Sequence, residues 1–416
     1  MRGGRRLART TGACVAIVAG VLGLSGCGGD NPDGAPKTGS RTLTIYSSLP
    51  LHGPARERSR DMVNAIKLAL EESGGKVGAL SVTYVSLNSA TEEEGTWSED
   101  QVLDNARQAV RDLNAIAYIG DRDSEATALS LPLINEGHIL QVSPSSTYDG
   151  LTRPGSRRQG EPERFYPSGR RTFGRVVPAD HVQASALVGY MKAEGVRTVA
   201  LLADRDLYGI GLANQVTKAA AGQGIKIVDL GRIDPSARDL AGHGRDIAAV
   251  AADAFLYAGA PDADSARVFT AAAAADPGLL LFGPGAGADG PFADGLSAPV
   301  QRRMRLTSPL LPPRLLPRAA REFRARFRTT FGRAPAPDAL AAYEATNVIL
   351  SAIARAGDKG NDRRAVADAF FEVRNRRSVL GTYSIDRFGD TSLSTFAGNR
   401  LRRSRLVLDK VLRVRR

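Results

Sequence analysis

Short apolar runs alternate with longer amphipathic stretches along most of this chain, and this alternation restricts the possible folds more than any other feature of the sequence. The runs TLTIYSS (42–48), LSVTYVSL (80–87) and AIAYIG (115–120) predict strands, and the stretches 61–72 and 100–114 predict amphipathic helices. Strands that alternate with helices of about 10–15 residues indicate a parallel sheet with helices on both faces.

The alternation lapses between residues 148 and 178, in a segment rich in proline, glycine and arginine, and restarts at TVALLAD (198–204). The second set continues to LLLFGPG (279–285), and long helical stretches follow at 318–331 and 336–356. With 416 residues, 43% of them hydrophobic, the chain is large enough for two cores. We therefore predict an α/β protein with two doubly wound, parallel-sheet lobes.

The N-terminus has the pattern of a secretory signal peptide, in which the charged leader MRGGRRLART precedes the apolar run GACVAIVAGVLGLSG. The run ends at LSGC (24–27), which resembles the bacterial lipobox, where the cysteine is acylated and becomes the new N-terminus. The other cysteine, Cys14, lies inside the leader, so Cys27 has no partner for an intramolecular disulfide. We expect a signal peptide at 1–26, lipidation of Cys27 with palmitate or a similar chain, and a flexible tether at 27–40.

The formal net charge is +12, and basic residues gather at 153–175 and 400–416. The second cluster, LRRSRLVLDKVLRVRR, alternates apolar and basic residues, which predicts a strand with one solvated face. It carries no nucleic-acid-binding signature, so we expect no nucleic-acid partner. A nucleophile elbow and a phosphate-binding loop are absent, and the four histidines lack metal-ligand spacing. We therefore expect no catalytic role, no cofactor and no metal site.

Polar residues follow the ends of several predicted strands. Ser124 follows the strand in YIGDRDSEA, and Ser145 and Thr147 follow the next one in VSPSST. In open parallel sheets ligands bind beyond the carboxyl ends of the strands, where helix N-termini offer unpaired N–H groups to a carboxylate. These hydroxyls are candidates for the same carboxylate, although serine and threonine at such positions also serve as helix caps.

Two residues of the second set are candidates for the rest of a ligand. Asp262, in LYAGAPDAD, either caps a helix or faces an ammonium group. Tyr208, in ADRDLYGIGLA, lies between a strand and a helix, where it either covers a ligand or packs against its own lobe.

In this order, the segments of the chain resemble the leucine/isoleucine/valine-binding type of periplasmic solute receptor, which has the type 1 fold. The likeness covers about 41–390 and is carried by SLPLHGP, YIGDRDSEATALSLPLINEGHILQVSPSST, FGRVVPADHVQASALVGYMKAEGVRTVALLADRDLYGIGLANQV, FLYAGAPDAD, APDALAAYEATNVILSAIARAG and GTYSIDRFGD. It implies one lobe at 41–177 plus 306–378 and another at 178–305 plus 379–416. The three hinge strands would cross near Val177, Leu306 and Leu380.

The resemblance also implies a site. Hydroxyls matching Ser124 and Thr147, with the backbone at Ser145, would take an amino-acid carboxylate; Asp262 would take the ammonium and Tyr208 would cover the ligand. The chain departs from the family where Asp262 replaces a common glutamate and where an aromatic residue near Arg58 is missing.

The function that the resemblance implies is that of an extracytoplasmic, lipid-anchored solute-binding protein. It would deliver a small ligand, most simply a branched-chain or other amino acid, to the membrane subunits of an ABC importer. The alternative is a receptor of the same fold that reports its ligand to a membrane partner. An enzyme is disfavoured because no nucleophile motif is present.

Overall fold

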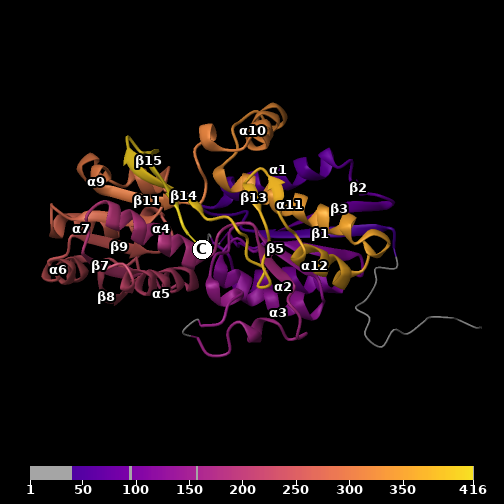
Figure 1. Ribbon diagram of the computed structural model, residues 1–416, viewed down its shortest axis with the longest axis horizontal. Helices are drawn as coiled ribbons and strands as arrows, with labels where there is room; N and C mark the ends of the chain where they lie inside the picture. Colours follow the sequence, from indigo (N-terminus) through magenta and orange to yellow (C-terminus); the bar gives the residue numbers. More distant parts are fainter. Residues whose placement is uncertain (1–39, 93–95, 156–157, 416) are drawn as a thin grey trace, which may run out of the picture. The chain divides into compact units, whose positions relative to one another are not determined.

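The computed structural model describes residues 40–92, 96–155 and 158–415. The expected signal peptide, Cys27 and the tether up to residue 39 lie outside these residues. Two large sheets carry the described chain, and Figure 1 shows each of them between layers of helices. None of the helices in this part of the chain combines the length and the apolar character that a membrane crossing requires.

The first sheet has the order β2-β3-β1-β4-β5-β6, and every neighbouring pair is parallel except β2 with β3. Its strands are β1 (Thr42–Leu49), β2 (Lys76–Val77), β3 (Leu80–Asn88), β4 (Ala115–Ile119), β5 (Leu140–Ser143) and β6 (Phe173–Arg175). Helices α1 (Arg56–Glu72), α10 (Arg318–Phe331), α11 (Pro337–Arg355) and α12 (Arg363–Phe371) pack into one core on this sheet. Helices α2 (Glu99–Arg111) and α3 (Ser124–Glu136) contribute to a second core.

Strand β1 shows why both faces are covered. Leu43 and Ile45 lie in the core with α1 and α11, whereas Tyr46 lies in the core with α2 and α3. Side chains on both faces of this strand are therefore buried, as expected for a central parallel strand. The predicted α/β class is confirmed.

The second sheet has the order β15-β14-β11-β10-β9-β7-β8, with parallel pairs from β8 to β11 and antiparallel pairs at β11–β14 and β14–β15. Its strands are β7 (Thr198–Ala203), β8 (Lys226–Arg232), β9 (Ala254–Ala258), β10 (Leu280–Pro284), β11 (Met304–Ser308), β14 (Thr395–Arg402) and β15 (Arg405–Arg413). Its helices are α4 (Asp180–Ala193), α5 (Leu207–Ala221), α6 (Ala241–Ala249), α7 (Ala263–Ala275), α8 (Pro291–Asp294) and α9 (Ala298–Arg303).

The basic C-terminal segment differs from its prediction, because it forms a hairpin rather than one strand. Arg403 and Ser404, both with positive φ, make the turn between β14 and β15. The shorter elements are β12 (Arg376–Ser378), β13 (Gly381–Tyr383) and the 3-10 turns η1 (Asp149–Leu151), η2 (Glu163–Phe165), η3 (Pro313–Leu315) and η4 (Gly357–Lys359).

The chain passes between the two sheets three times. The first passage follows Val177, which lies in the first core, and the second follows Ser308 at the end of β11, beyond the expected crossover at Leu306. The third lies between Ile385 and β14, later than the crossover expected near Leu380, because Tyr383 and Ile385 pack in the first core. We use "first lobe" and "second lobe" for the elements packed on the first and second sheets.

Candidate ligand-binding site

A cavity of about 880 Å³ lies beyond the carboxyl ends of the central strands of both sheets. From the first lobe it is lined by Ser124, Ser145 and Thr147, and from the second lobe by Asp206 and Tyr208. Four of the five predicted ligand-binding residues therefore line one cavity. Asp262 does not line it in this conformation.

The first-lobe wall is a pair of loops joined by serine hydroxyls. The hydroxyl of Ser143 donates to the carbonyl of Asp121 at 2.8 Å and accepts from the amide of Ser146 at 2.8 Å. The buried hydroxyl of Ser146 lies 2.6 Å from that of Thr127 in α3. These bonds fix the loop after β5 against the start of α3, which places Ser145 and Thr147 beside that helix N-terminus.

Ser124 and Ser145 are already engaged with neighbouring backbone. Ser124 is the first residue of α3 rather than its cap, because Asp123 occupies the N-cap position. Its hydroxyl accepts from the amide of Tyr148 at 3.3 Å, so its proton is available to another acceptor. Ser145 uses its hydroxyl proton on the carbonyl of Arg122 at 2.7 Å. The amide of Ser145 donates to the hydroxyl of Ser143 at 3.2 Å, so both donors of Ser145 are used within the first-lobe wall in this conformation.

Asp262 is a helix cap. Its carboxylate accepts from the amide of Ser265 at 2.7 Å, and the hydroxyl of Ser265 accepts from the amide of Asp262 at 2.8 Å. This reciprocal capping box occupies the start of α7, and the side chain is exposed outside the cavity. Of the two roles that the sequence left open for Asp262, the structure shows capping.

Asp206 is the acid that the second lobe presents to the cavity. It stands at the N-cap position of α5, yet its side chain makes no capping hydrogen bond. Burial raises the pKa of Asp206, and the negative charges of Asp123 and Asp262 raise it further. Since Asp123 belongs to the first lobe, acids of both lobes face each other here. Sequence reasoning missed Asp206, although it lies only two residues before Tyr208.

A hydrogen bond joins the two lobes close to Asp123 and Asp206. The carboxylate of Glu125, in the first turn of α3, accepts from the amide of Leu207 in α5 at 3.3 Å. Burial raises the pKa of Glu125, with Asp206 adding to the effect. A positive group placed between the two carboxylates would relieve their mutual repulsion.

Tyr208 fits both interpretations of its position. Its ring packs against the second-lobe core and also lines the cavity. Its hydroxyl donates to Gln183 at 3.3 Å, and burial raises the pKa of Tyr208 well above its usual value. The phenol is therefore neutral, and its ring offers an apolar wall and a π face.

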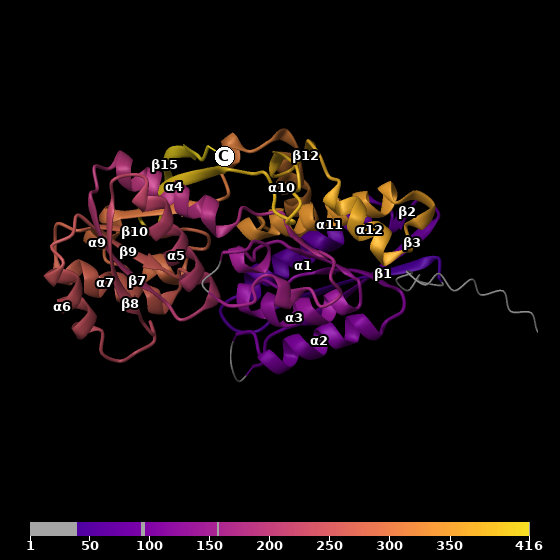
Figure 2. The same cartoon turned by 60° about the horizontal axis from the view of Figure 1, so that its bottom comes forward.

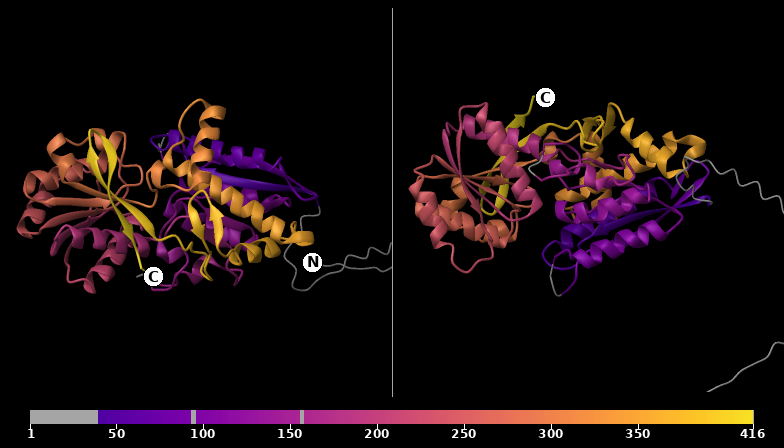
Figure 3. Two further views of the ribbon diagram at one scale, coloured as in Figure 1. Left: turned by 45° about the horizontal axis from the view of Figure 1, so that its top comes forward. Right: turned by 90° about the horizontal axis from the view of Figure 1, so that it is seen from below.

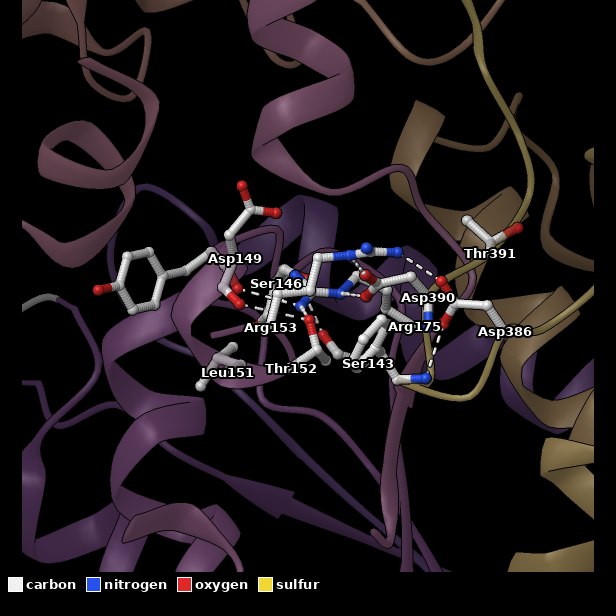
Figure 4. A network of polar contacts seen from close by, with 12 residues as sticks. Ser143, Ser146, Asp149, Leu151, Thr152, Arg153, Arg175, Asp386, Asp390 and Thr391 are labelled. Carbon is white, nitrogen blue, oxygen red and sulfur yellow. Dashed lines mark hydrogen bonds and ion pairs between the residues drawn. The ribbon is translucent and has the colours of Figure 1, made fainter. Parts of the chain in front are cut away.

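A buried arginine, Arg175, supports the first-lobe wall from behind (Figure 4). Its fully buried guanidinium donates to the carbonyls of Ser146 and Tyr148, each at 3.0 Å. Its Nε lies 2.9 Å from a carboxylate oxygen of Asp390, in the third passage between the lobes. The loop that carries Ser145 and Thr147 is thus tied to a hinge segment.

A second arginine extends this network and gives part of the basic connector a structural role. The Nε of Arg153 lies 2.6 Å from Asp390, and its guanidinium also pairs with Asp386. Burial alone would raise the pKa of Asp390, but Arg175 and Arg153 hold that pKa below its usual value. An arginine within the apolar run FGRVV was the one sequence signal of this network.

Two arginines of the first lobe, Arg58 and Arg122, also line the cavity. Arg58 pairs with Asp338 at 2.6 Å, and Arg122 pairs with Asp123 at 3.0 Å. Arg58 reaches across to the second lobe, since a Cβ on Gly287 would lie 1.7 Å from its Nη1. No group of three or more His, Cys, Asp or Glu side chains that could hold a metal ion occurs among the residues that the structure describes.

The chain belongs to the periplasmic binding protein family, whose model matches residues 42–391. Members of this family are extracytoplasmic binding proteins and not enzymes, which confirms the predicted class and excludes the catalytic alternative. No curated protein sequence matches the chain.

Solved structures share the fold at low sequence identity. A leucine-binding protein from Thermotoga maritima is 21% identical with a TM-score of 0.75, and the match covers 89% of this chain and 99% of that one. A branched-chain amino-acid binding protein from Streptococcus pneumoniae, in complex with isoleucine, is 16% identical with a TM-score of 0.72, covering 90% and 99%. A solute-binding protein from R. palustris, in complex with benzoate, is 16% identical with a TM-score of 0.72, covering 89% and 96%. The predicted type 1 fold is confirmed.

Proposed function

We propose that this protein captures an amino acid between its two lobes and delivers it to an ABC importer, while a lipid on Cys27 holds it at the outer face of the cell membrane. The observation that carries the proposal is the arrangement of polar groups in the cavity. The first lobe offers hydroxyls and a helix N-terminus, and Asp206 of the second lobe faces the first-lobe acids Asp123 and Glu125 across the cavity. An amino acid has the opposite pair of charges. The leucine- and isoleucine-binding relatives support the same ligand class.

The ligand carboxylate is assigned to the first lobe. The N-terminus of α3 supplies free N–H groups and a partial positive charge, and the hydroxyls of Ser124 and Thr147 stand beside it. The amide of Ser145 would join the set by exchanging its 3.2 Å bond to the hydroxyl of Ser143 for the ligand. Because Arg175 holds the carbonyls of Ser146 and Tyr148, these donors keep their positions without a ligand.

The ligand ammonium is assigned to Asp206, in place of the predicted Asp262. Asp206 lines the cavity and makes no capping bond, whereas the carboxylate of Asp262 is used at α7. Tyr208, two residues further along, would cover the ligand from the same lobe. Both ligand charges are then satisfied only when the two lobes hold the ligand together.

The first experiment is a thermal-shift screen with leucine, isoleucine, valine, glutamate and benzoate. A ligand at about 100 times its dissociation constant stabilises the folded chain by roughly 2.7 kcal/mol. Stabilisation by an amino acid supports the proposal. Stabilisation by benzoate alone would mean that the ligand has no ammonium, and the assignment of Asp206 would be wrong.

The second experiment compares two acids by calorimetry with the best amino acid. Asp206→Asn should weaken binding by about 10- to 150-fold, because a charge-assisted hydrogen bond contributes about 1.5–3 kcal/mol. Asp262→Asn serves as the matched control and should change affinity by less than about twofold, since it alters only a helix cap. The reverse order would restore the ammonium role to Asp262.

A further inference from the structure

Two segments of the chain each carry a large excess of basic residues. Residues 314–333 contain seven arginines and one glutamate, a net charge of +6. Residues 400–416 contain seven arginines, one lysine and one aspartate, a net charge of +7. Together they carry +13, against +12 for the whole chain. The remaining residues sum to a charge of −1, in which the seven arginines and two glutamates of 153–175 are offset by acidic residues elsewhere.

The two segments meet at one groove, although they belong to different lobes. Arg324 of α10 lines the same cavity as Arg403 and Arg405 of the hairpin. Helix α10 packs on the first core through Phe323 and Phe327, whereas the hairpin packs on the second sheet. Figures 2 and 3 show α10 and the hairpin on either side of the 309–317 passage. We call η3, α10 and the hairpin together the basic rim.

Most cations of the basic rim have no acidic partner. Arg318, Arg326, Arg333, Arg400 and Lys410 form ion pairs. No described carboxylate pairs with the others, which are Arg314, Arg321, Arg324, Arg328, Arg402, Arg403, Arg405, Arg413 and Arg415. Burial lowers the pKa of Arg324, and the neighbouring charge of Arg328 lowers it further, as expected where positive charge is uncompensated.

Exposed apolar side chains accompany these cations. Three large hydrophobic residues are exposed in the described chain, and two of them belong to the basic rim. Leu315, in η3, is 43% exposed, and Val407, in β15, is 44% exposed. A surface that combines unpaired arginines with protruding aliphatic side chains matches the region of a bilayer where phosphates meet acyl chains.

We propose that the basic rim binds the anionic headgroups of the membrane surface. Guanidinium groups pair well with phosphates, and each arginine held near an anionic bilayer strengthens binding about fivefold.

A fluid lipid surface fits the rim better than an acidic protein segment does. The unpaired arginines lie on elements of two lobes, and closure of the lobes around a ligand would change the distances between them. A protein partner with fixed acidic side chains would lose its register on closure, whereas lipid headgroups rearrange. The rim would therefore stay bound in both states of the proposed capture cycle.

The test is co-sedimentation of a chain that begins at Gly28, and so contains the whole compact unit Ala35–Arg416, with lipid vesicles. We expect binding to vesicles that contain phosphatidylglycerol and no binding to pure phosphatidylcholine. Raising the salt concentration from 50 to 300 mM should weaken binding several-fold, because it shortens the screening length. Absence of binding to the anionic vesicles would overturn the proposal and favour an acidic protein partner.

Two charge-matched variants separate the rim from net charge. One variant replaces by glutamine four unpaired, exposed rim arginines that do not line the cavity: Arg314, Arg328, Arg402 and Arg413. The control replaces four exposed arginines elsewhere: Arg107, Arg111, Arg238 and Arg245. The rim variant should lose at least tenfold in vesicle affinity and keep its unfolding midpoint, and the control should lose less than threefold. Equal losses would show a non-specific charge effect and overturn the rim as the site.

Discussion

Replacing Asp390 by alanine should destabilise the first lobe strongly, because it strands a buried charge. Arg175 is fully buried and Asp390 is 3% exposed, with 2.9 Å between the guanidinium Nε and the carboxylate. Removing one partner of a buried ion pair typically costs about 3–5 kcal/mol. At roughly 2–4 °C per kcal/mol for a folding unit of 150–250 residues, the melting temperature should fall by about 6–20 °C.

The assay is urea unfolding at pH 7.5, followed by fluorescence and circular dichroism, with Asp368→Ala as the control. Asp368 pairs with Arg170 at 2.6 Å, but both side chains are about half exposed. An exposed pair contributes about 0–1 kcal/mol, so the control should stay close to the unmodified chain. A loss below about 1 kcal/mol in Asp390→Ala would refute the reasoning, because the Arg175 charge would then have found another partner or water.

The pH dependence of this pair has a definite sign. The pKa of Asp390 is held below 3.8 in the folded chain, so its contribution is present at neutral pH and is lost as the pH falls through that lowered value. In a double variant, Arg175→Met with Asp390→Leu, no buried charge is stranded. Stability should recover in part only, since the carbonyls of Ser146 and Tyr148 lose their donors.

Three further outcomes are expected. Burial and the nearby charge of Asp206 raise the pKa of Asp204 to about 8. The folded chain therefore keeps a proton on Asp204 that the unfolded chain releases near pH 3.8. The free energy of unfolding should therefore decrease from about pH 4 to pH 8, and Asp204→Asn should flatten that decrease in urea titrations; a slope unchanged by the substitution would contradict this. Small-angle scattering should show a smaller radius of gyration with saturating ligand, and no change would count against capture between two lobes. Cys27→Ala should move the protein from the membrane fraction to the soluble fraction. A variant that stays in the membrane fraction would show that acylation of Cys27 is not what retains the protein.

The sequence predicts the long helices well, because the spacing of apolar residues that marks a helix lies within the helix itself. The stretch 318–331 coincides with α10, and the predicted helix 336–356 differs from α11 by one residue at each end. The predicted position of the third passage, near Leu380, lies too early in the chain, because the short strands that precede the passage give weak sequence signals. Strands β12 and β13 have three residues each, and only the packing of Tyr383 and Ile385 in the first core shows where the chain leaves that lobe.

The candidate site is predicted less completely. An acid can bind the ligand only if its carboxylate oxygens do not already accept hydrogen bonds within the protein, and the sequence does not show this. Asp262 follows a strand as a ligand-binding acid would, but Ser265 three residues later is also the pattern of a capping box. Asp206 gives no comparable signal, and its role appears only when the cavity is seen. Arg175 and Asp390 are 215 positions apart, so no periodicity or motif connects them.

The first hydrophobic core has a consequence for how the protein is made. It joins Leu43 of β1 to Ile385, beyond β13, and one face of its sheet is covered by α11 and α12 from late in the chain. A nascent chain that has emerged only as far as β11 exposes that face to water, and no shorter N-terminal fragment can complete either lobe. The first lobe can therefore complete its core only once α11 and α12 are available, and a chain truncated after β11 should be aggregation-prone rather than a functional half.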